Sequence, residues 1–176
     1  MSIVITILLI LAGIIALLLI IGLFMKQDHF VKRDIIINAP SEKVFDFLRF
    51  LKNQEKFNRW AKADADRHAT FKGTDGTVGY VYAWNGDRSV GEGEKEILNI
   101  IEGKKIETEI RFVRPMKTSA RVTFETEPLA DHQTKVWLSN AGNLKYPFNI
   151  MIPMFQKMFG KDMDSSLKTL KNILEQ

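Results

Sequence analysis

The first 25 residues carry no charged side chain, and this run constrains the chain more than any other feature of its sequence. All 25 basic and all 21 acidic residues lie between positions 26 and 176. A soluble domain of this size has no place for an uncharged apolar run of that length, which excludes a wholly soluble protein. The sequence contains no second such run, which excludes a polytopic membrane protein.

Residues 3–24 are the candidate membrane span. As a helix, these 22 residues would measure about 33 Å, and the hydrocarbon core of a bilayer is about 30 Å thick. A signal peptide would have a basic start and a shorter apolar stretch, whereas this segment begins Met-Ser and is longer. We therefore expect residues 1–25 to be a retained transmembrane anchor. Cleavage, or a helix that lies in the lipid interface, are the alternatives.

The first basic residues, Lys26, Lys32 and Arg33, all follow the span, and none precedes it. The positive-inside rule then favours the cytoplasmic side for the soluble part, residues 30–176. Residues 26–29 form a linker so short that the domain must sit close to the bilayer, where the three basic residues could attract anionic head groups. The alternative is that they serve only as the charged flank that stops transfer.

The soluble part changes its periodicity twice along the chain. A strand-like run at 30–37 precedes Pro40, which suits the first turn of a helix, and a second short helix is expected within 52–59. Between 68 and 140, apolar and polar residues alternate as in strands, and Asn85-Gly86 predicts a tight hairpin turn. After Pro147 the apolar residues recur near every 3.6 positions, with a bend or break expected near Pro153 and Gly160.

Strands with one apolar and one charged face are typical of an antiparallel sheet that is solvated on one side. The apolar face must be covered, and the last helix is the only element long enough to cover it. The sequence therefore predicts an α+β domain: a curved antiparallel sheet of about seven strands wrapped on a long C-terminal helix, with two short helices after the first strand. One transmembrane helix precedes it.

This order of elements resembles the START-like helix-grip superfamily (SRPBCC), and within it the polyketide cyclase/dehydrase group. The likeness is carried by Ile35-Ile36-Ile37-Asn38-Ala39-Pro40-Ser41-Glu42-Lys43-Val44-Phe45, by Trp60 at the end of the second helix, and by the closing helix from Phe159 to Leu170. Glycine-rich strand starts at 76–84 and 91–93 complete the pattern. The likeness covers about residues 30–175, and some relatives also carry an N-terminal membrane span.

The resemblance implies an apolar cavity between the sheet and the last helix. The candidate ligand-binding residues are polar-tipped or flexible apolar side chains that could shape and orient a ligand there: Trp60, Tyr80, Tyr82, Trp84, Phe112, Phe124, Met154, Met158 and Met163. The alternative for each is ordinary core packing.

Signals for catalysis, metals and nucleic acid are weak in this chain. It has no Cys, and His29, His68 and His132 lack the spacing of metal ligands, so we expect no metal and no cofactor. Glu92, Glu94 and Glu96 share one strand face, which is typical of a solvated surface. The basic residues form no stripe with stacking aromatics, so nucleic-acid binding is not expected.

We therefore interpret the chain as a membrane-tethered module that binds a lipophilic small molecule or lipid. Its expected partners are the lipid bilayer and that ligand. An enzyme of cyclase or dehydratase type, with Tyr80 or Tyr82 as general acid, is one alternative. A protein-interaction or stress-response adaptor is another, because part of the resembled superfamily has such roles.

Overall fold

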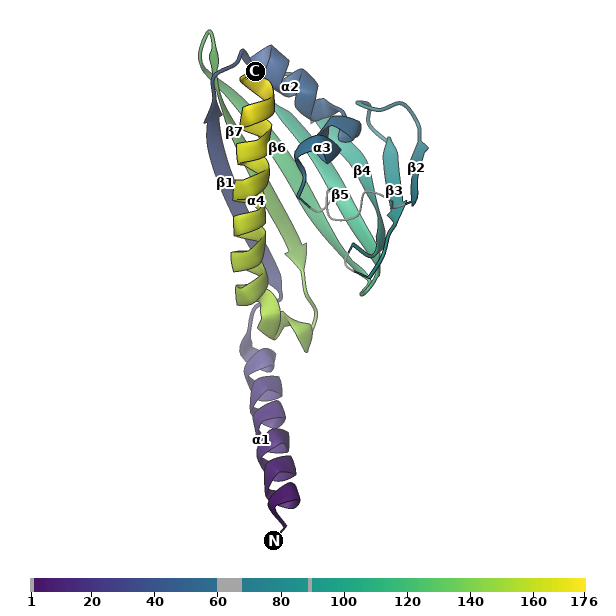
Figure 1. The fold of residues 1–176 in the computed structure, drawn as a ribbon, viewed down its shortest axis with the longest axis vertical. Helices are drawn as coiled ribbons and strands as arrows, with labels where there is room; N and C mark the ends of the chain where they lie inside the picture. The colour runs from purple at the N-terminus through teal and green to yellow at the C-terminus, as the bar shows by residue number, and fades with distance from the viewer. Residues whose placement is uncertain (1, 60–67, 89) are drawn as a thin grey trace.

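The computed structural model describes residues 2–59, 68–88 and 90–176 (Figure 1). The helices are α1 (Ile3–Phe24), α2 (Ser41–Arg49), α3 (Leu51–Phe57), the 3-10 helix η1 (Phe148–Met151) and α4 (Ile152–Leu174). The strands are β1 (Asp28–Ile37), β2 (His68–Lys72), β3 (Val81–Asn85), β4 (Glu92–Ile101), β5 (Lys105–Arg114), β6 (Thr118–Ala130) and β7 (Gln133–Asn143).

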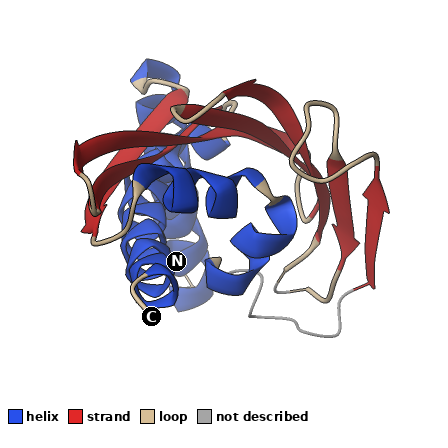
Figure 2. Cartoon of the chain, turned by 90° about the horizontal axis from the view of Figure 1, so that it is seen from above, coloured by secondary structure: helices blue, strands red, loops and turns tan. Residues whose placement is uncertain are grey.

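The seven strands form one antiparallel sheet in the order β1-β7-β6-β5-β4-β3-β2. The last strand in sequence, β7, pairs with the first, so β1 and β2 lie at opposite edges and α2 and α3 connect them. Figure 2 shows the strands arching over α2, α3 and α4, which lie together on the concave side. This arrangement confirms the predicted curved sheet, long C-terminal helix and two short helices after the first strand.

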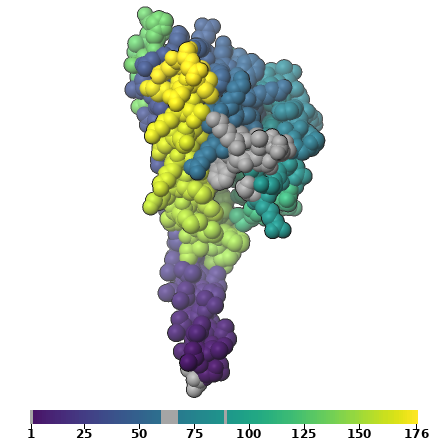
Figure 3. Space-filling view, in the orientation of Figure 1, coloured from purple at the N-terminus to yellow at the C-terminus, as the bar shows by residue number. Residues whose placement is uncertain are grey.

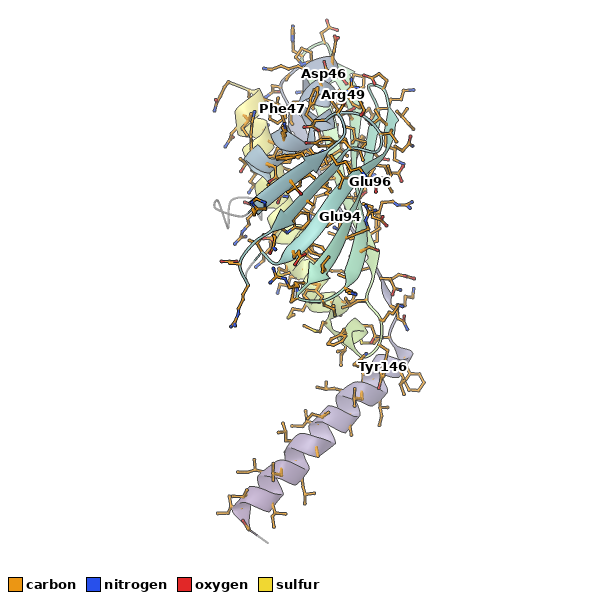
Figure 4. All side chains as sticks on the ribbon, turned by 90° about the vertical axis from the view of Figure 1, so that its right-hand side faces the viewer. Asp46, Phe47, Arg49, Glu94, Glu96 and Tyr146 are labelled. Carbon is orange, nitrogen blue, oxygen red and sulfur yellow. The ribbon has the colours of Figure 1, made fainter. Side chains whose placement is uncertain are left out.

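Alternation along the strands separates a charged outer face from an apolar inner face. On the outer face, Arg111 of β5 bonds to Glu94 and Glu96 of β4, with 2.7 Å between Arg111 Nε and Glu94 Oε1 (Figure 4). The hydrogen bonds that the Arg111 guanidinium donates to Glu96 and then to Glu94 raise its pKa above its ordinary value. The acidic residues of β4 thus lie on the solvated side, as their spacing predicted.

The inner face packs on α2 and α4 to form the main core. Leu167 and Leu170 of α4 meet Ile37 of β1 and Leu48 of α2, and all four are almost completely buried. Burial of each such side chain contributes roughly 1.5–3 kcal/mol to the free energy of folding. These contacts hold α4 on the inner face of the sheet.

Two local predictions were wrong. Asn85-Gly86 is not a two-residue turn, because β3 ends at Asn85 and β4 begins only at Glu92; the longer loop is closed by the Gly86 N–H bonding to the Gly91 carbonyl. Nor does α4 break near Gly160. Pro153 occupies its first turn, where no backbone N–H is needed, and Gly160 makes room for the Arg33 side chain lying across the helix.

The N-terminal helix α1 projects away from the domain as an isolated rod (Figure 3). By length and composition it could cross a membrane, and none of its most apolar window, whose mean hydropathy is 3.4, is buried in the protein. Its last turn meets the domain at η1, where Gly22 is buried. Met25, Lys26 and Gln27 alone separate α1 from β1.

Candidate functional site

A cavity of about 380 Å³ lies between the inner face of the sheet and the helices α3 and α4. That volume falls within the range of roughly 300–1,000 Å³ that small-molecule sites occupy. Its walls are mainly apolar and aromatic, and come from strands β3 to β7, from the start of β1, and from the helices α3 and α4. The side chains that form these walls are Phe57, Tyr82, Trp84, Ile110, Phe112, Val122, Phe124, Leu138, Phe155, Phe159 and Met163.

Five of the predicted ligand-binding residues line this cavity: Tyr82, Trp84, Phe112, Phe124 and Met163. Tyr82 stacks on Trp84 with 5.7 Å between ring centroids, and Phe112 meets the Trp84 ring edge-on at 5.8 Å. These aromatic rings form a continuous wall along β3 and β5. Whether a ligand occupies the space beside them stays a prediction, and Trp60 lies outside the described residues.

Three other predicted residues lie away from the cavity walls. Met154 is 57% exposed and Met158 follows one turn later, whereas Phe155, Phe159 and Met163 face the cavity. In the first two turns of α4, the side chains that face the cavity therefore lie one residue, or about 100°, away from the predicted Met154 and Met158. Tyr80 precedes β3 and packs in a small separate core with Leu51 and Ile97.

The Tyr80 hydroxyl is buried without a hydrogen-bond partner among the described residues. Burial, and then the charge of Asp75, raise the pKa of Tyr80 above its ordinary value. This hydroxyl therefore keeps its proton at neutral pH and is separated from the cavity. It does not suit the role of general acid that the sequence suggested for Tyr80.

One end of the cavity holds a polar cluster that sequence reasoning missed in part. Lys95 of β4 donates a hydrogen bond to the Gln54 side-chain oxygen, and Gln54 Nε2 donates to the Leu48 carbonyl at 2.7 Å. Beside them, the Tyr82 hydroxyl donates to Glu55 Oε2 at 2.8 Å. Lys95, Gln54, Glu55 and Tyr82 all line the cavity.

Lys95 could have been found from the alternation of β4. Because Glu94 and Glu96 point outward, the residue between them must point inward, toward the core. The structure places Lys95 opposite Tyr82 of β3 and Ile110 of β5, with only 9% of its surface exposed. Burial lowers the pKa of the Lys95 ammonium to about 8.

A second polar pair lies at the other side of the cavity. The His29 ring nitrogen Nε2 is 3.0 Å from Asn140 Oδ1, and the ring lies 6.0 Å from that of Phe159. The sequence analysis assigned His29 no role in the cavity, but β1 begins at Asp28 and its pairing with β7 turns His29 to the cavity. No local sequence pattern reveals that pairing.

The predicted membrane-proximal basic residues separate into two groups. Lys26 is exposed at the end of α1. Lys32 instead bonds to Glu125 at 2.9 Å, and the Arg33 guanidinium lies across Gly160 of α4 with 3.3 Å between its Nε and Asp164 Oδ1. The pairing of β1 with its neighbours directs these two charges along the domain surface.

A second hollow adjoins the cavity at the end of the domain nearest α1. Phe112, Met116 and Leu144 contribute to both spaces, and Lys117, Lys145 and Tyr146 line the second hollow alone. Tyr146 lies beside the last turn of α1 (Figure 4), where a side chain at Gly22 would meet its ring at 3.4 Å. The cavity thus extends toward the junction with α1.

Asn149 of η1 fixes that junction. Its buried side-chain nitrogen donates to the Gly22 carbonyl at 2.7 Å and to the Met25 carbonyl at 3.0 Å. The last carbonyls of a helix have no partner within it, so these bonds cap α1 from the domain side. The position of α1 relative to the cavity is therefore set by η1 as well as by the short linker.

No family model matches the chain, and no curated protein matches it in sequence. Among solved structures, it is similar to norcoclaurine synthase from Thalictrum flavum in complex with dopamine and hydroxybenzaldehyde, with a TM-score of 0.63 and 12% identity over 89% of this chain and 92% of that one. It is also similar to protein MLL2253 from Mesorhizobium loti, with a TM-score of 0.62 and 17% identity over 84% and 97% of the two chains.

A third similar structure is the Aha1 dimer from Colwellia psychrerythraea, with a TM-score of 0.58 and 18% identity over 84% of this chain and 96% of that one. Each of these likenesses spans nearly the whole solved chain. At such low sequence identities, these similarities support the fold alone and not a function. Residues 28–176 therefore adopt the helix-grip fold that the sequence predicted.

Proposed function

We propose that this protein is a membrane-tethered module that binds a lipophilic small molecule or lipid between its sheet and α4. The observation that carries the proposal is the cavity of about 380 Å³ with mainly apolar and aromatic walls. A dry core of this fold would fill that space with side chains, since protein interiors are packed as densely as organic crystals. An apolar ligand is the natural occupant of an apolar space of this size.

The position of α1 supports a ligand that comes from the bilayer. If α1 spans the membrane, its end at Phe24 lies near the head groups, and η1 and Tyr146 lie beside it. The hollow that leads toward the cavity is on this side of the domain. A lipid could then exchange one apolar environment for another without crossing bulk water.

Charge at the same end supports contact with anionic head groups. Lys26, Lys117 and Lys145 are exposed around the junction and the hollow. Basic residues close to an anionic leaflet contribute about 1 kcal/mol each to the attraction. The cytoplasmic leaflet carries most such lipids, which agrees with the cytoplasmic orientation that the sequence favours.

The proposal is tested by filling the cavity without altering the outer surface. Ala120→Trp places a large ring in the cavity wall of β6, and Thr123→Trp adds the same ring on the outer face of the same strand. Full-length proteins purified in mild detergent are extracted with organic solvent and the extracts are analysed by mass spectrometry. We expect lipophilic species with the wild type and Thr123→Trp, and their loss with Ala120→Trp.

Absence of any such species from the wild-type extract, together with an unchanged melting temperature across a panel of added lipids, would refute the binding function. Retention of the same species by Ala120→Trp would place the ligand elsewhere on the protein.

A catalytic role is a second candidate, and the Tyr82–Glu55 hydrogen bond favours it. A hydroxyl that donates to a carboxylate inside a cavity can relay protons: as its oxygen takes a proton from a bound substrate, its own proton passes to Glu55, and the reverse step returns a proton to the substrate. Tyr82→Phe removes this proton while keeping the ring that stacks on Trp84. Turnover of a candidate cyclase or dehydratase substrate that is unchanged in Tyr82→Phe would reject Tyr82 as its acid.

A further inference from the structure

The described residues that line the cavity include one buried cation, Lys95, and none of them forms an ion pair with it. Its side chain runs inward from the middle of β4, between Tyr82 of β3 and Ile110 of β5 on the neighbouring strands. Only 9% of the residue is exposed, and it contributes to the cavity wall. An ammonium group in such a position loses its hydration and needs compensating partners.

The described residues supply one hydrogen-bond partner for the three N–H donors of Lys95. That partner is the Gln54 side-chain oxygen, and the bond from Gln54 Nε2 to the Leu48 carbonyl holds the oxygen toward Lys95. Gln54 is neutral. Nowhere in residues 2–59, 68–88 and 90–176 does a carboxylate oxygen come within 4.0 Å of the Lys95 nitrogen.

The groups that face Lys95 from the neighbouring elements do not remove its charge. Glu55 of α3 lies in the same cluster and accepts a hydrogen bond from the Tyr82 hydroxyl, but it forms no ion pair with Lys95. Burial lowers the pKa of Lys95 to about 8, which still leaves most of the molecules protonated at pH 7. The cavity therefore presents a cation with unused donors at one end of an apolar space.

We propose that Lys95 binds the carboxylate of an apolar acid, with the acid's hydrocarbon part lying along the aromatic and aliphatic walls of the cavity. This inference rests on the proposed function and names the chemical class of its ligand. A charge-assisted hydrogen bond to a buried ammonium is worth about 1.5–3 kcal/mol, which corresponds to roughly ten- to a hundred-fold in affinity. An uncharged ligand of equal length cannot gain it.

The charge count of the cavity favours a monoanion over a phosphate. Among the described cavity-lining residues, Lys95 is the single Lys or Arg, and two are acidic: Glu55 accepts a hydrogen bond from Tyr82, and Asp162 is paired with Arg59 at 2.7 Å. A phosphate monoester carries close to two negative charges at neutral pH and needs more than one cation to offset its desolvation. One ammonium matches one carboxylate.

The test compares three probes with the same twelve-carbon chain: dodecanoic acid, 1-dodecanol and dodecyl phosphate. Radiolabelled probes are bound at equilibrium to the full-length protein in nanodiscs of zwitterionic lipid, with empty nanodiscs as background. Lys95→Met removes the charge but keeps most of the length of the side chain. Lys104→Met, at an exposed lysine, is the matched control.

We expect the wild type and Lys104→Met to bind dodecanoic acid at least tenfold more tightly than 1-dodecanol. Lys95→Met should lose that preference, through weaker binding of the acid and unchanged or tighter binding of the alcohol.

Equal affinity of the wild type for acid and alcohol would overturn the role of Lys95 and leave the proposed binding function standing. Tighter binding of dodecyl phosphate than of the acid would overturn the assignment to a carboxylate. Binding of none of the three probes would instead refute the proposed function, and the inference with it.

Discussion

Removing the charge of Lys95 should stabilise this protein at neutral pH. The ammonium is buried, and its pKa falls from 10.5 in the unfolded chain to about 8 in the folded protein. At about 1.4 kcal/mol for each pH unit, keeping the protonated group inside costs the folded state on the order of 3 kcal/mol. Lys95→Met leaves the buried Gln54 oxygen without a donor, and this loss destabilises the variant by about 1 kcal/mol or more. The net gain is about 2 kcal/mol.

The stability difference must also depend on pH. Below about pH 8 both the folded and the unfolded chain are protonated at Lys95, so the full cost is present. Between about pH 8 and 10.5 the folded protein has released this proton while the unfolded chain still binds it. Wild-type stability therefore rises with pH relative to Lys95→Met across that window, and the advantage of the variant disappears.

Urea unfolding of the full-length proteins in detergent, followed by circular dichroism at pH 7, 8, 9 and 10, measures both effects. Subtracting the variant from the wild type at each pH cancels the other groups that titrate there, including the tyrosines. Lys104→Met, at an exposed lysine, should show no such pattern. A Lys95→Met protein that is less stable than the wild type at pH 7, or a difference that stays constant to pH 10, would refute this account of Lys95.

Three further perturbations test other parts of the structure. Phe124→Ala removes a buried ring packed edge-on against Phe57 and should lower the free energy of unfolding in urea by about 3–5 kcal/mol. Met154→Ala, at an exposed position, should lower it by less than about 0.5 kcal/mol, and equal losses would contradict the exposed position of Met154. Gly93→Ala brings a methyl group within 2.8 Å of the Trp84 ring. The substitution should therefore destabilise the fold by about 1–3 kcal/mol and shift the tryptophan fluorescence emission. An unchanged emission spectrum would show that Trp84 does not lie on Gly93. Asn149→Ala removes two hydrogen bonds to carbonyls at the end of α1. The distance distribution between spin labels at positions 21 and 157 should then be broader than in the wild type. Identical distributions would show that the short linker, and not Asn149, holds α1 in place.

The architecture could be predicted from the sequence because it depends on patterns that are local. The charged outer residues of β4 and β5 alternate with apolar ones, and this period of two survives whatever the strands pair with. The length of the last apolar stripe then left one helix able to cover the sheet. The number of strands and their solvated face follow from the same observations.

The cavity was less predictable, because its walls depend on rotation and register. Met154 and Phe155 are adjacent in sequence and both apolar, yet a helix turns about 100° between them and only Phe155 reaches the cavity. His29 faces the cavity because β1 pairs with β7, more than 100 residues away, and no local pattern contains that pairing. Lys95 is the exception, since its outward neighbours Glu94 and Glu96 already implied its inward direction.

The cap that Asn149 places on α1 has a mechanical consequence. η1 ends at Met151 and α4 begins at the next residue, so the helix that lines the cavity is continuous with the turn that holds Gly22. Phe155 lies within one helical turn of that boundary and contacts whatever fills the cavity. If a ligand displaces the first turn of α4, we expect the shift to reach the end of α1 through the backbone of η1 and the two hydrogen bonds of Asn149. Filling the cavity and tilting the N-terminal helix would then be one coupled motion.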